Sequence, residues 1–312
     1  MSSTHLVRLG KSELKVSPIC FGTWQLSPKF WGEQSQSEIS SAIQLAYDLG
    51  INFIDTADAY GDGLAEQVVG KAIKSLPREK LVIATKVYNH FYPDGSRHGD
   101  LSSDYILKAC DDSLRRLDLD YIDLYQCHAF DPLVRYDELA ETLNSLVKAG
   151  KIRAYGVSNW SVEQMRTGSM MGNYATCQPV YSLLKRDIEK DILPYCQGND
   201  IGTLIYSSLH LGLLTGKYKG HETFTDVRQS RPDFQGERYK LICERVQQVG
   251  EIAKKYDLTT VQLVLAVTLM HPGITSAIVG IKTQQQIKEA AGAMGKTVSI
   301  VDWNQVRTLL TV

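Results

Sequence analysis

Short apolar runs alternate along the chain with longer segments in which apolar residues recur at helical spacing. Runs of four to seven apolar residues bounded by turn-forming residues predict strands. The predicted strands are Pro18–Gly22, Asn52–Asp55, Leu81–Val87, Tyr121–Cys127, Ala154–Ser158, Thr176–Val180, Thr203–Ser207 and Ala277–Gly280. The predicted helices are Ser37–Leu49, Glu66–Lys74, Ser103–Leu117, Tyr136–Lys148, Val162–Met171, Ile188–Gln197, Leu241–Tyr256 and Thr283–Ala293.

This alternation predicts a parallel α/β fold, because the strands are apolar on both faces, as in sheets covered by helices. Both a closed (β/α)8 TIM barrel and an open doubly wound sheet have this order of elements. The barrel is favoured, since eight repeats within 312 residues suit a fold that takes roughly 250 residues plus insertions. The nearest dinucleotide-binding fingerprint, Gly61-Asp62-Gly63-Leu64-Ala65-Glu66, lacks its third glycine, which weakens the case for the open sheet.

Two segments fall outside the repeat. Residues 6–16 predict an N-terminal β-hairpin before the barrel, and residues 218–236 form a long polar loop. Loops of that length are often functional. No low-complexity stretch or long linker divides the chain, so we expect a single domain over residues 1–312.

The composition is that of an ordinary globular protein, with 43% hydrophobic residues, 22% charged residues and a formal net charge of -1. Such a balance gives no electrostatic reason to expect nucleic acid or a membrane surface as a partner. The stretch Met1–Val16 lacks the apolar core of a signal peptide, and no later stretch is long and apolar enough to span a bilayer, so we expect a cytoplasmic protein.

Six cysteines, none in a C-x-x-C pair, predict reduced and mostly buried thiols. Cys127 next to His128 is a weak indication of a metal site. Because two further ligands at workable spacing are missing around this pair, we expect no metal.

Polar residues stand at the ends of three neighbouring predicted strands. Asp55 ends the second strand, Lys86 lies at the end of the third, and His128 follows the fourth; Tyr60 lies five residues after Asp55. In a barrel of this kind the carboxyl ends of the strands meet at one mouth, which is where active sites lie. We therefore expect the four side chains to converge.

These four residue types suit the reduction of a carbonyl group. A carbonyl that accepts hydride becomes an alkoxide and needs a proton, which Tyr60 can donate if Lys86 lowers its pKa from roughly 10. Asp55 would serve as the counter-ion of Lys86, and a histidine can hold the substrate oxygen by a hydrogen bond. Taken singly, each residue also has an ordinary interpretation: a helix cap, a solvated lysine, or a satisfied core side chain.

Several separated motifs resemble the aldo-keto reductases. They are Asp55-Thr56-Ala57-Asp58-Ala59-Tyr60-Gly61, Thr85-Lys86, His128, Gly156-Val157-Ser158-Asn159, Gln178, Tyr206-Ser207, Gly212-Leu213-Leu214-Thr215-Gly216-Lys217-Tyr218, Gly280 and Gln286. The resemblance covers nearly the whole chain. With the opening Leu9-Gly10-Lys11-Ser12, it is nearest to the bacterial and plant branch that includes the potassium-channel beta subunits.

The resemblance implies reversible, NADPH-dependent reduction of aldehydes and ketones. It implies Tyr60 as general acid, Lys86 and Asp55 as the groups that tune it, and His128 as the residue that orients the substrate. The implied cofactor-binding residues are Thr23, Trp24, Asp55, Ser158, Asn159, Gln178, Tyr206, Ser207, Leu209, Leu211, Lys217, Arg228, Gly280, Lys282, Gln286 and Glu289. Lys282 and Arg228 carry the preference for NADP, since relatives bind the 2′-phosphate there.

Aromatic residues predict an apolar wall for the substrate. The expected substrate-contacting residues are Trp24, Trp31, Tyr60, His128 and Trp160, with Phe30 and Tyr88 beside them. The alternative interpretation puts about half of these aromatic residues in the outer core. Three residues depart from the family pattern: Ser208 and Val279 replace usual prolines, and Ala290 replaces an asparagine. We expect Ser208 to loosen its loop and all three to affect cofactor affinity.

Two other functions remain open from the sequence. The chain could be a cofactor-binding regulatory subunit, like the channel-associated relatives, although these often lack a histidine at the position of His128. It could also be a cofactor-free barrel enzyme in which Lys86 forms a Schiff base.

Overall fold

The computed structural model describes residues 6–91 and 96–312. Met1 to His5, which belong to the stretch examined for an export signal, lie outside the described residues. None of the helices within these described ranges is long and apolar enough to cross a membrane.

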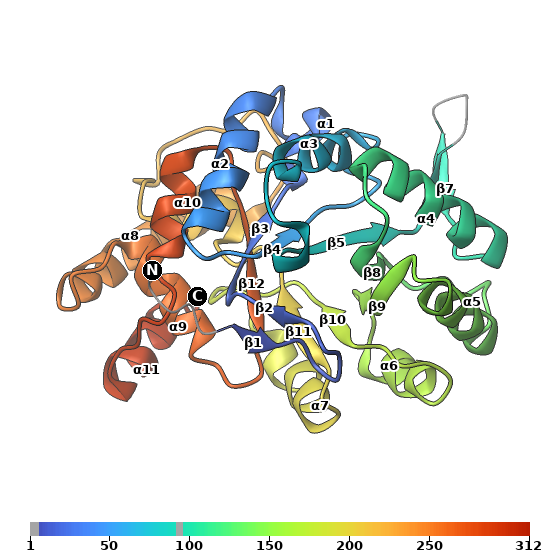
Figure 1. Ribbon diagram of the computed structural model, residues 1–312. Helices are drawn as coiled ribbons and strands as arrows, with labels where there is room; N and C mark the ends of the chain where they lie inside the picture. The colour runs from blue at the N-terminus through green and yellow to red at the C-terminus, as the bar shows by residue number, and fades with distance from the viewer. Residues whose placement is uncertain (1–5, 92–95) are drawn as a thin grey trace.

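Eight parallel strands close into a barrel, as predicted (Figure 1). They are β3 (Ile19–Gly22), β4 (Phe53–Asp55), β5 (Val82–Val87), β8 (Ile122–Cys127), β9 (Ile152–Ser158), β10 (Thr176–Gln178), β11 (Gly202–Ile205) and β12 (Ser276–Gly280). Neighbours in this order pair with one another, and β12 pairs back onto β3. The open doubly wound sheet is therefore excluded, and the predicted strand ends differ from the observed ones by only one or two residues.

Both faces of the strands are apolar because both are buried. Along β3, Ile19 and Phe21 pack into the layer between strands and helices, whereas Cys20 packs inside the barrel with residues such as Phe53 and Leu124. Successive side chains of a strand point to opposite faces, so a strand buried on both faces is largely apolar along its whole length rather than at alternate positions.

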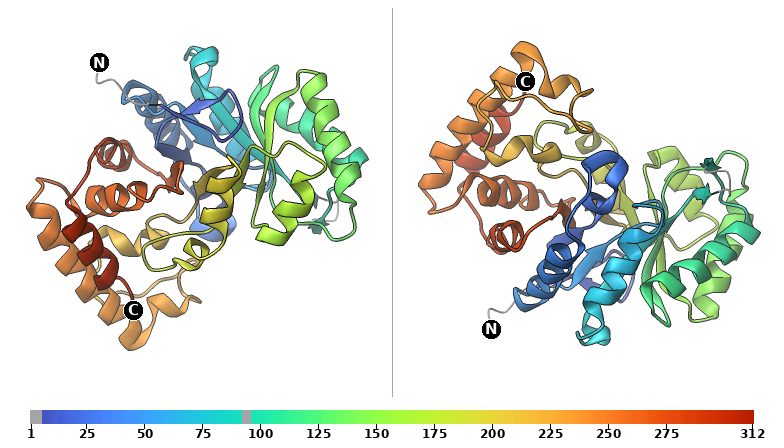
Figure 2. Two further views of the ribbon diagram at one scale, coloured as in Figure 1. Left: turned by 90° about the horizontal axis from the view of Figure 1, so that it is seen from below. Right: turned by 90° about the horizontal axis from the view of Figure 1, so that it is seen from above.

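The helices surround the barrel, as Figures 1 and 2 show. They are α1 (Pro28–Trp31), α2 (Gln36–Asp48), α3 (Leu64–Ile73), α4 (Ser103–Leu117), α5 (Tyr136–Lys148), α6 (Val162–Ser169), α7 (Ile192–Gly198), α8 (Gly236–Lys254), α9 (Thr260–Leu269), α10 (Gln284–Ala291) and α11 (Ile300–Leu309). Side chains cap the start of two of these helices, since Ser161 and Thr283 accept hydrogen bonds from the backbone N–H groups of Gln164 and Gln286.

The N-terminal hairpin closes the end of the barrel opposite the site. It consists of β1 (Val7–Arg8) and β2 (Lys15–Val16), paired antiparallel as predicted. Leu9, Leu14 and Val16 are buried in the cluster that fills the barrel interior. The hairpin therefore closes the barrel at the amino ends of the strands, and the cavity opens at their carboxyl ends.

Several elements were not predicted. α9 is buried nearly all round, from Val261 to Thr268, and so lacks the polar face by which helices are recognised. The sequence also did not predict α11 or a second hairpin, which consists of β6 (Asn89–Phe91) and β7 (Arg97–Gly99). The hairpin was not predicted because it has no apolar run. The predicted helix 188–197 was wrong at its start: a 3-10 turn, Asp187–Glu189, precedes α7.

All six cysteines are free and buried, as the sequence predicted.

Candidate active site at the barrel mouth

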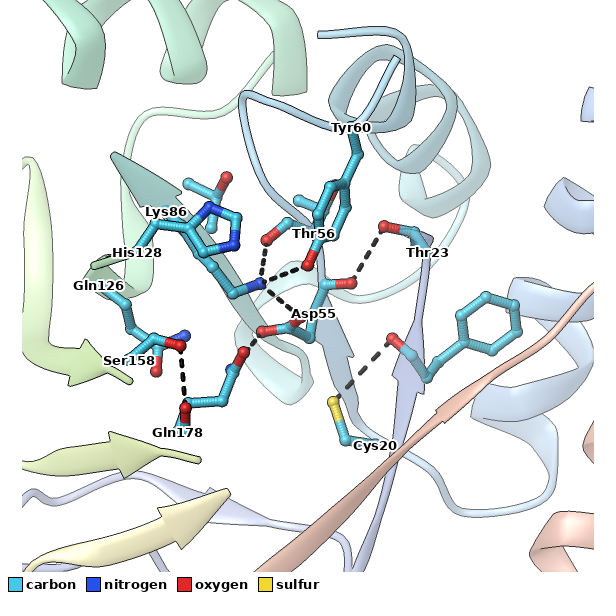
Figure 3. Close-up of polar contacts among 12 residues, drawn as sticks. Cys20, Thr23, Asp55, Thr56, Tyr60, Lys86, Gln126, His128, Ser158 and Gln178 are labelled. Carbon is cyan, nitrogen blue, oxygen red and sulfur yellow. Dashed lines mark hydrogen bonds and ion pairs between the residues drawn. The ribbon is translucent and has the colours of Figure 1, made fainter. Parts of the chain in front are cut away.

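Three neighbouring strands bring the predicted site residues to the same mouth. Asp55 is the last residue of β4, Lys86 is the penultimate residue of β5, and His128 directly follows β8. Tyr60 reaches the same place from the loop between β4 and α3 (Figure 3). The parallel pairing of β4 with β5 and of β5 with β8 sets this convergence, because it aligns the carboxyl ends of all three strands.

Lys86 is at the centre of the site. Its side chain is fully buried, and its Nζ donates to Asp55 Oδ1 at 2.6 Å and to the carbonyl oxygen of Thr56 at 2.8 Å. The third contact is to the hydroxyl of Tyr60 at 3.4 Å, as Figure 3 shows. An ammonium group has three N–H donors, so one acceptor is present for each of them.

Lys86 is protonated despite its burial. Burial pulls the pKa of this lysine down, but the charge of Asp55 and the contact with Tyr60 outweigh burial and raise the pKa above its usual value. A charged ammonium group has no free electron pair. This state argues against Lys86 as a Schiff-base nucleophile and suits it as an electrostatic partner of Tyr60.

Tyr60 is held in its protonated form. Burial raises the pKa of its phenol, and the nearby Lys86 ammonium only partly reverses the effect. The sequence predicted that Lys86 would lower this pKa. The lysine acts in that direction, but desolvation of the phenol is the larger effect.

His128 is neutral. Its pKa is lowered to about 3, first by burial and then by the charge of Lys86. Its ring meets that of Tyr60 edge-on, with centroids 5.9 Å apart. Within the described part of the chain its Nδ1 is buried without a hydrogen-bond partner. A neutral imidazole keeps one N–H donor, and both rings border the cavity.

A chain of hydrogen bonds links Asp55 to the next strands of the barrel. Gln178 on β10 donates from Nε2 to Asp55 Oδ2 at 2.9 Å, and the hydroxyl of Ser158 donates to the Gln178 carbonyl at 2.8 Å. Asn159 donates to Ser158 Oγ at 3.0 Å and accepts from the hydroxyl of Tyr206 at 2.9 Å. Ser158, Asn159 and Gln178, which are among the predicted cofactor-binding residues, therefore form one connected polar surface.

A cavity of about 910 Å³ extends from these residues across the mouth. All predicted cofactor-binding residues line it, as do four of the five predicted substrate-contacting residues, namely Trp24, Trp31, Tyr60 and His128. Lys86 does not itself line the cavity. Its Nζ lies behind the cavity wall and contacts the hydroxyl of Tyr60, which does line it. A cavity of this volume can hold an extended ligand of dinucleotide size.

Trp160 is the exception among the predicted substrate-contacting residues. It is 1% exposed, packs against Phe130, Tyr136 and Tyr174, and is not among the residues lining the cavity. Its position fits the alternative interpretation, that of a core residue. The sequence alone does not show whether the ring of an aromatic residue just after a strand end points into the cavity or into the core.

Three basic side chains lie near one another on the cavity wall. Lys217, Arg228 and Lys282 all line it, and the charges of Arg228 and Lys217 lower the pKa of Lys282 together with burial, which is the larger cause. Arg228 is paired with Asp226. Positive charges that repel one another favour an anion between them, and the start of α10 lies directly after Lys282.

Ser208 anchors its loop, whereas the sequence predicted that it would loosen the loop. Its buried hydroxyl donates to the carbonyl oxygen of Ile278 on β12 at 2.9 Å. The serine thus ties the segment after β11 to the neighbouring strand. The same segment is bent sharply, with positive φ at Ser207, His210 and Leu211.

Sequence reasoning missed several residues of the cavity wall. Asn89 and Arg97 come from the unpredicted hairpin, and Arg231 and Asp233 come from the long loop after η4 (His210–Thr215). The loop 218–236 was expected to be functional, and its Arg228 was already a predicted cofactor-binding residue, so Arg231 was a candidate on the same grounds. Nothing in the sequence brings the hairpin to the mouth.

A buried lysine–aspartate pair lies beside a tyrosine and a histidine at the mouth of a parallel barrel, next to a long cavity with a basic cluster on its wall. This combination is typical of barrel oxidoreductases. The model of the Aldo/keto reductase family matches residues 18–311. The chain therefore belongs to the aldo/keto reductase family, whose members carry out NAD(P)H-dependent carbonyl reduction.

Curated relatives span almost its entire length. Aldo-keto reductase YhdN of Bacillus subtilis (strain 168) is 39% identical over 306 residues, covering 95% of this chain and 91% of that protein. The NADH-specific methylglyoxal reductase of Escherichia coli (strain K12) is 32% identical, covering 97% of each. A putative voltage-gated potassium channel subunit beta of Schizosaccharomyces pombe is 33% identical, covering 92% and 87%, which confirms the predicted branch.

Solved structures agree in fold. The glycerol dehydrogenase AKR11B4 from Gluconobacter oxydans superposes with a TM-score of 0.91 at 32% identity, covering 99% of this chain and 95% of that one. An aldo/keto reductase from Klebsiella pneumoniae, solved in complex with NADP and acetate, gives a TM-score of 0.77 at 30% identity, covering 98% and 95%.

Proposed function

We propose that this chain reduces aldehydes and ketones to alcohols with NADPH, in a reversible reaction at the barrel mouth. The observation that carries the proposal is the buried Lys86 ammonium group, which contacts both Asp55 and the hydroxyl of Tyr60. An ammonium group at this place stabilises the phenolate that remains once Tyr60 has donated its proton.

The bound nicotinamide would supply the hydride in reduction and take it up in the reverse reaction. Tyr60 donates its proton to the substrate oxygen as negative charge develops there, and Lys86 stabilises the resulting phenolate. Asp55 keeps Lys86 charged. His128, being neutral, donates a hydrogen bond to the same substrate oxygen and fixes its position. Trp24 and Trp31 form the apolar wall for the rest of the substrate.

The proposed cofactor site follows the length of the cavity. Ser158, Asn159 and Gln178 hold the carboxamide, and Tyr206 stacks on the ring. The other residues proposed to contact the cofactor are Thr23, Trp24 and Asp55 near the nicotinamide, Ser207, Leu209, Leu211 and Lys217 along the pyrophosphate, and Gly280, Gln286 and Glu289 around the adenosine. Their common place on the cavity wall supports this assignment, as does the unpartnered Nδ1 of His128, which suits a site completed by ligands.

The preference for NADPH over NADH rests on Lys282 and Arg228. The relatives differ on this point, since one is named as NADH-specific and another was solved with NADP. A charge-assisted contact to a phosphate contributes about 1.5–3 kcal/mol. We therefore expect Lys282→Ala to raise the KM for NADPH by about tenfold to a hundredfold while changing that for NADH little. An equal loss with both cofactors would contradict the assignment.

Tyr60→Phe tests the mechanism directly. It removes one oxygen atom and keeps the ring, so NADPH binding, measured by fluorescence titration, stays within about twofold of the wild-type value, whereas kcat for aldehyde reduction falls by roughly 10²–10⁴. Full turnover by this variant would rule out Tyr60 as the proton donor.

A regulatory subunit is the second candidate function, because one relative is named as a putative potassium channel subunit beta. The presence of His128 and its neutral state favour the enzyme. NADPH consumption with a panel of aldehydes supports the enzyme; no consumption, together with stable co-purification with a membrane protein, supports the subunit.

A further inference from the structure

The unpredicted hairpin β6–β7 has two different faces. His90 pairs with His98, and Asn89 pairs with Gly99, in antiparallel register. Because alternate residues of a strand point to opposite faces, Asn89 and Arg97 share one face and His90, His98 and Asp100 share the other. Asn89 and Arg97 line the cavity, so the histidines and the aspartate face away from it.

The three side chains on the outer face form a compact group. One ligand atom from each of His90, His98 and Asp100 lies within 4.8 Å of the other two. His90 Nδ1 is 2.8 Å from Asp100 Oδ2, and the two imidazole rings are 5.4 Å apart between centroids. Two imidazole nitrogens and one carboxylate oxygen therefore surround a common point.

Neighbouring groups orient His90 and Asp100. The His90 ring stacks on the ring of Tyr105 in α4, at 4.2 Å and 14°, and the Tyr105 hydroxyl donates to the carbonyl oxygen of Asn89. Asp100 Oδ1 accepts from the backbone N–H of Ser102 at 2.8 Å. Figure 1 shows β7 beside α4, the helix that carries Tyr105.

The hydrogen bond from Ser102 to Asp100 and the stacking of His90 on Tyr105 hold two of the donor groups in place, as neighbouring groups typically do in metal sites.

We propose that His90, His98 and Asp100 bind a divalent transition-metal ion of the Zn²⁺ type on the outer face of this hairpin. Two imidazoles with one carboxylate, leaving a position for water, are a common donor set for Zn²⁺. Ligand atoms around tetrahedral Zn²⁺ lie about 3.4 Å apart, so the side chains need to shift by only about 1 Å. Atoms near the 4.8 Å limit would move closer together, whereas His90 Nδ1 and Asp100 Oδ2, at 2.8 Å, would move apart. The expectation of no metal considered only Cys127 and His128.

The ion would join both strands of the hairpin at a point where they pack on α4. The opposite face of the hairpin forms part of the cavity wall, so occupancy is expected to alter the KM for the carbonyl substrate. This consequence depends on the proposed carbonyl reduction, whereas metal binding itself does not.

Metal titration of the full chain with NADP⁺ present tests the site. After dialysis against a chelator and its removal, Zn²⁺ is titrated calorimetrically, and Co²⁺ is titrated as a probe with visible absorption. The variants are His98→Asn, which changes an exposed residue, and Asp100→Asn, which keeps an acceptor for the Ser102 N–H. His221→Asn, at an exposed histidine of the loop 218–236, is the matched control.

We expect the wild-type chain and His221→Asn to bind one ion per chain with the same affinity, and both site variants to bind at least tenfold more weakly. Zn²⁺ should also raise the melting temperature of the wild-type chain by a few degrees and leave that of His98→Asn unchanged. Absence of saturable binding, or equal affinity in His98→Asn, overturns the proposal. Neither readout uses catalysis, so the test of the metal site is independent of the proposed mechanism. If Tyr60→Phe kept full activity, the mechanism would be contradicted, but the result of the metal titration would still stand.

Discussion

Lys86 carries a buried positive charge whose cost is offset by the oxygen atoms around it. Desolvation of an isolated ammonium group costs several kcal/mol, and Asp55 at 2.6 Å supplies the opposite charge. Gln178 holds the second oxygen of Asp55, so the carboxylate is oriented from two strands. The site is thus a set of mutually dependent residues, in which a change at one alters the protonation of another.

The pH dependence of reduction should follow the phenol of Tyr60. A general acid works only while it is protonated. The value of kcat/KM for reduction should therefore be highest below the pKa of Tyr60 and fall as the pH rises through that pKa. Lys86 lowers this pKa, although burial raises it. In Lys86→Met the alkaline limb of the pH–rate profile should therefore move to higher pH, and kcat should fall. A limb that stays in place would show that another group titrates.

His128 should make the fold sensitive to acid. Its folded-state pKa of about 3 lies below the ordinary value of 6.5, so the unfolded chain takes up this proton first as the pH falls. The stability contributed by neutral His128 is present above about pH 6.5 and is lost progressively down to about pH 3, at about 1.4 kcal/mol for each pKa unit at most. In His128→Asn, chemical denaturation between pH 7 and pH 4 should show a shallower loss of stability than in the wild-type chain. Parallel losses would contradict this account.

At the scale of elements, the position of α3 depends on a close approach to α4. α3 begins directly after the loop that carries Tyr60, and Gly70 lies on its buried face. A Cβ atom at Gly70 would come within 2.3 Å of the carbonyl oxygen of Leu117, the last residue of α4. A glycine is therefore required there for contact between the helices, even though glycine disfavours a helix interior.

Gly70→Ala should destabilise the protein by about 1–3 kcal/mol, because the overpacking outweighs the gain in helix propensity of up to about 1 kcal/mol. Gly198→Ala is the matched control, since Gly198 ends α7 and has open space around it. We expect the control to be neutral or slightly stabilising. Thermal melting of both variants tests the difference, and an unchanged melting temperature in Gly70→Ala would contradict the packing argument.

Across the whole molecule, segments distant in sequence enclose the cavity. The backbone N–H of Val227, in the long loop, donates to the carbonyl oxygen of Phe30, and Lys282 lies 4.9 Å from the centroid of the Trp31 ring. Arg228 also lies over that ring, at 5.6 Å. A ligand in the cavity would therefore contact three segments together: the segment after β3 that carries Phe30 and Trp31, the loop 218–236, and the segment after β12 that carries Lys282.

NADPH should therefore stabilise the whole fold. At a concentration a hundredfold above its Kd, a ligand adds about 2.7 kcal/mol to the free energy of unfolding. We expect a rise of several degrees in melting temperature with NADPH, a smaller rise with NADH, and a reduced difference between the two in Lys282→Ala. Identical shifts with both cofactors in the wild-type chain would argue against the proposed phosphate site.

Local pattern was sufficient for the order and type of most elements. The strands from Ile19–Gly22 to Ser276–Gly280 are mostly apolar, and this pattern indicates burial on both faces without knowledge of the neighbours. Asp55, Lys86 and His128 lie at or next to the carboxyl ends of three of these strands, and the geometry of parallel barrels alone predicts that such ends meet. Fold class and the convergence of the four central residues could thus be inferred from the chain.

Other properties depended on contacts between distant segments. The net rise in the pKa of Tyr60 comes from burial by neighbours, which no residue type reveals. The direction of the Trp160 ring, the anchoring of Ser208 to β12 and the arrival of Arg97 at the mouth are likewise set by packing. Periodicity records whether a position is buried, whereas pKa values, side-chain directions and cavity walls depend on which groups surround it, and only the folded chain brings those groups together.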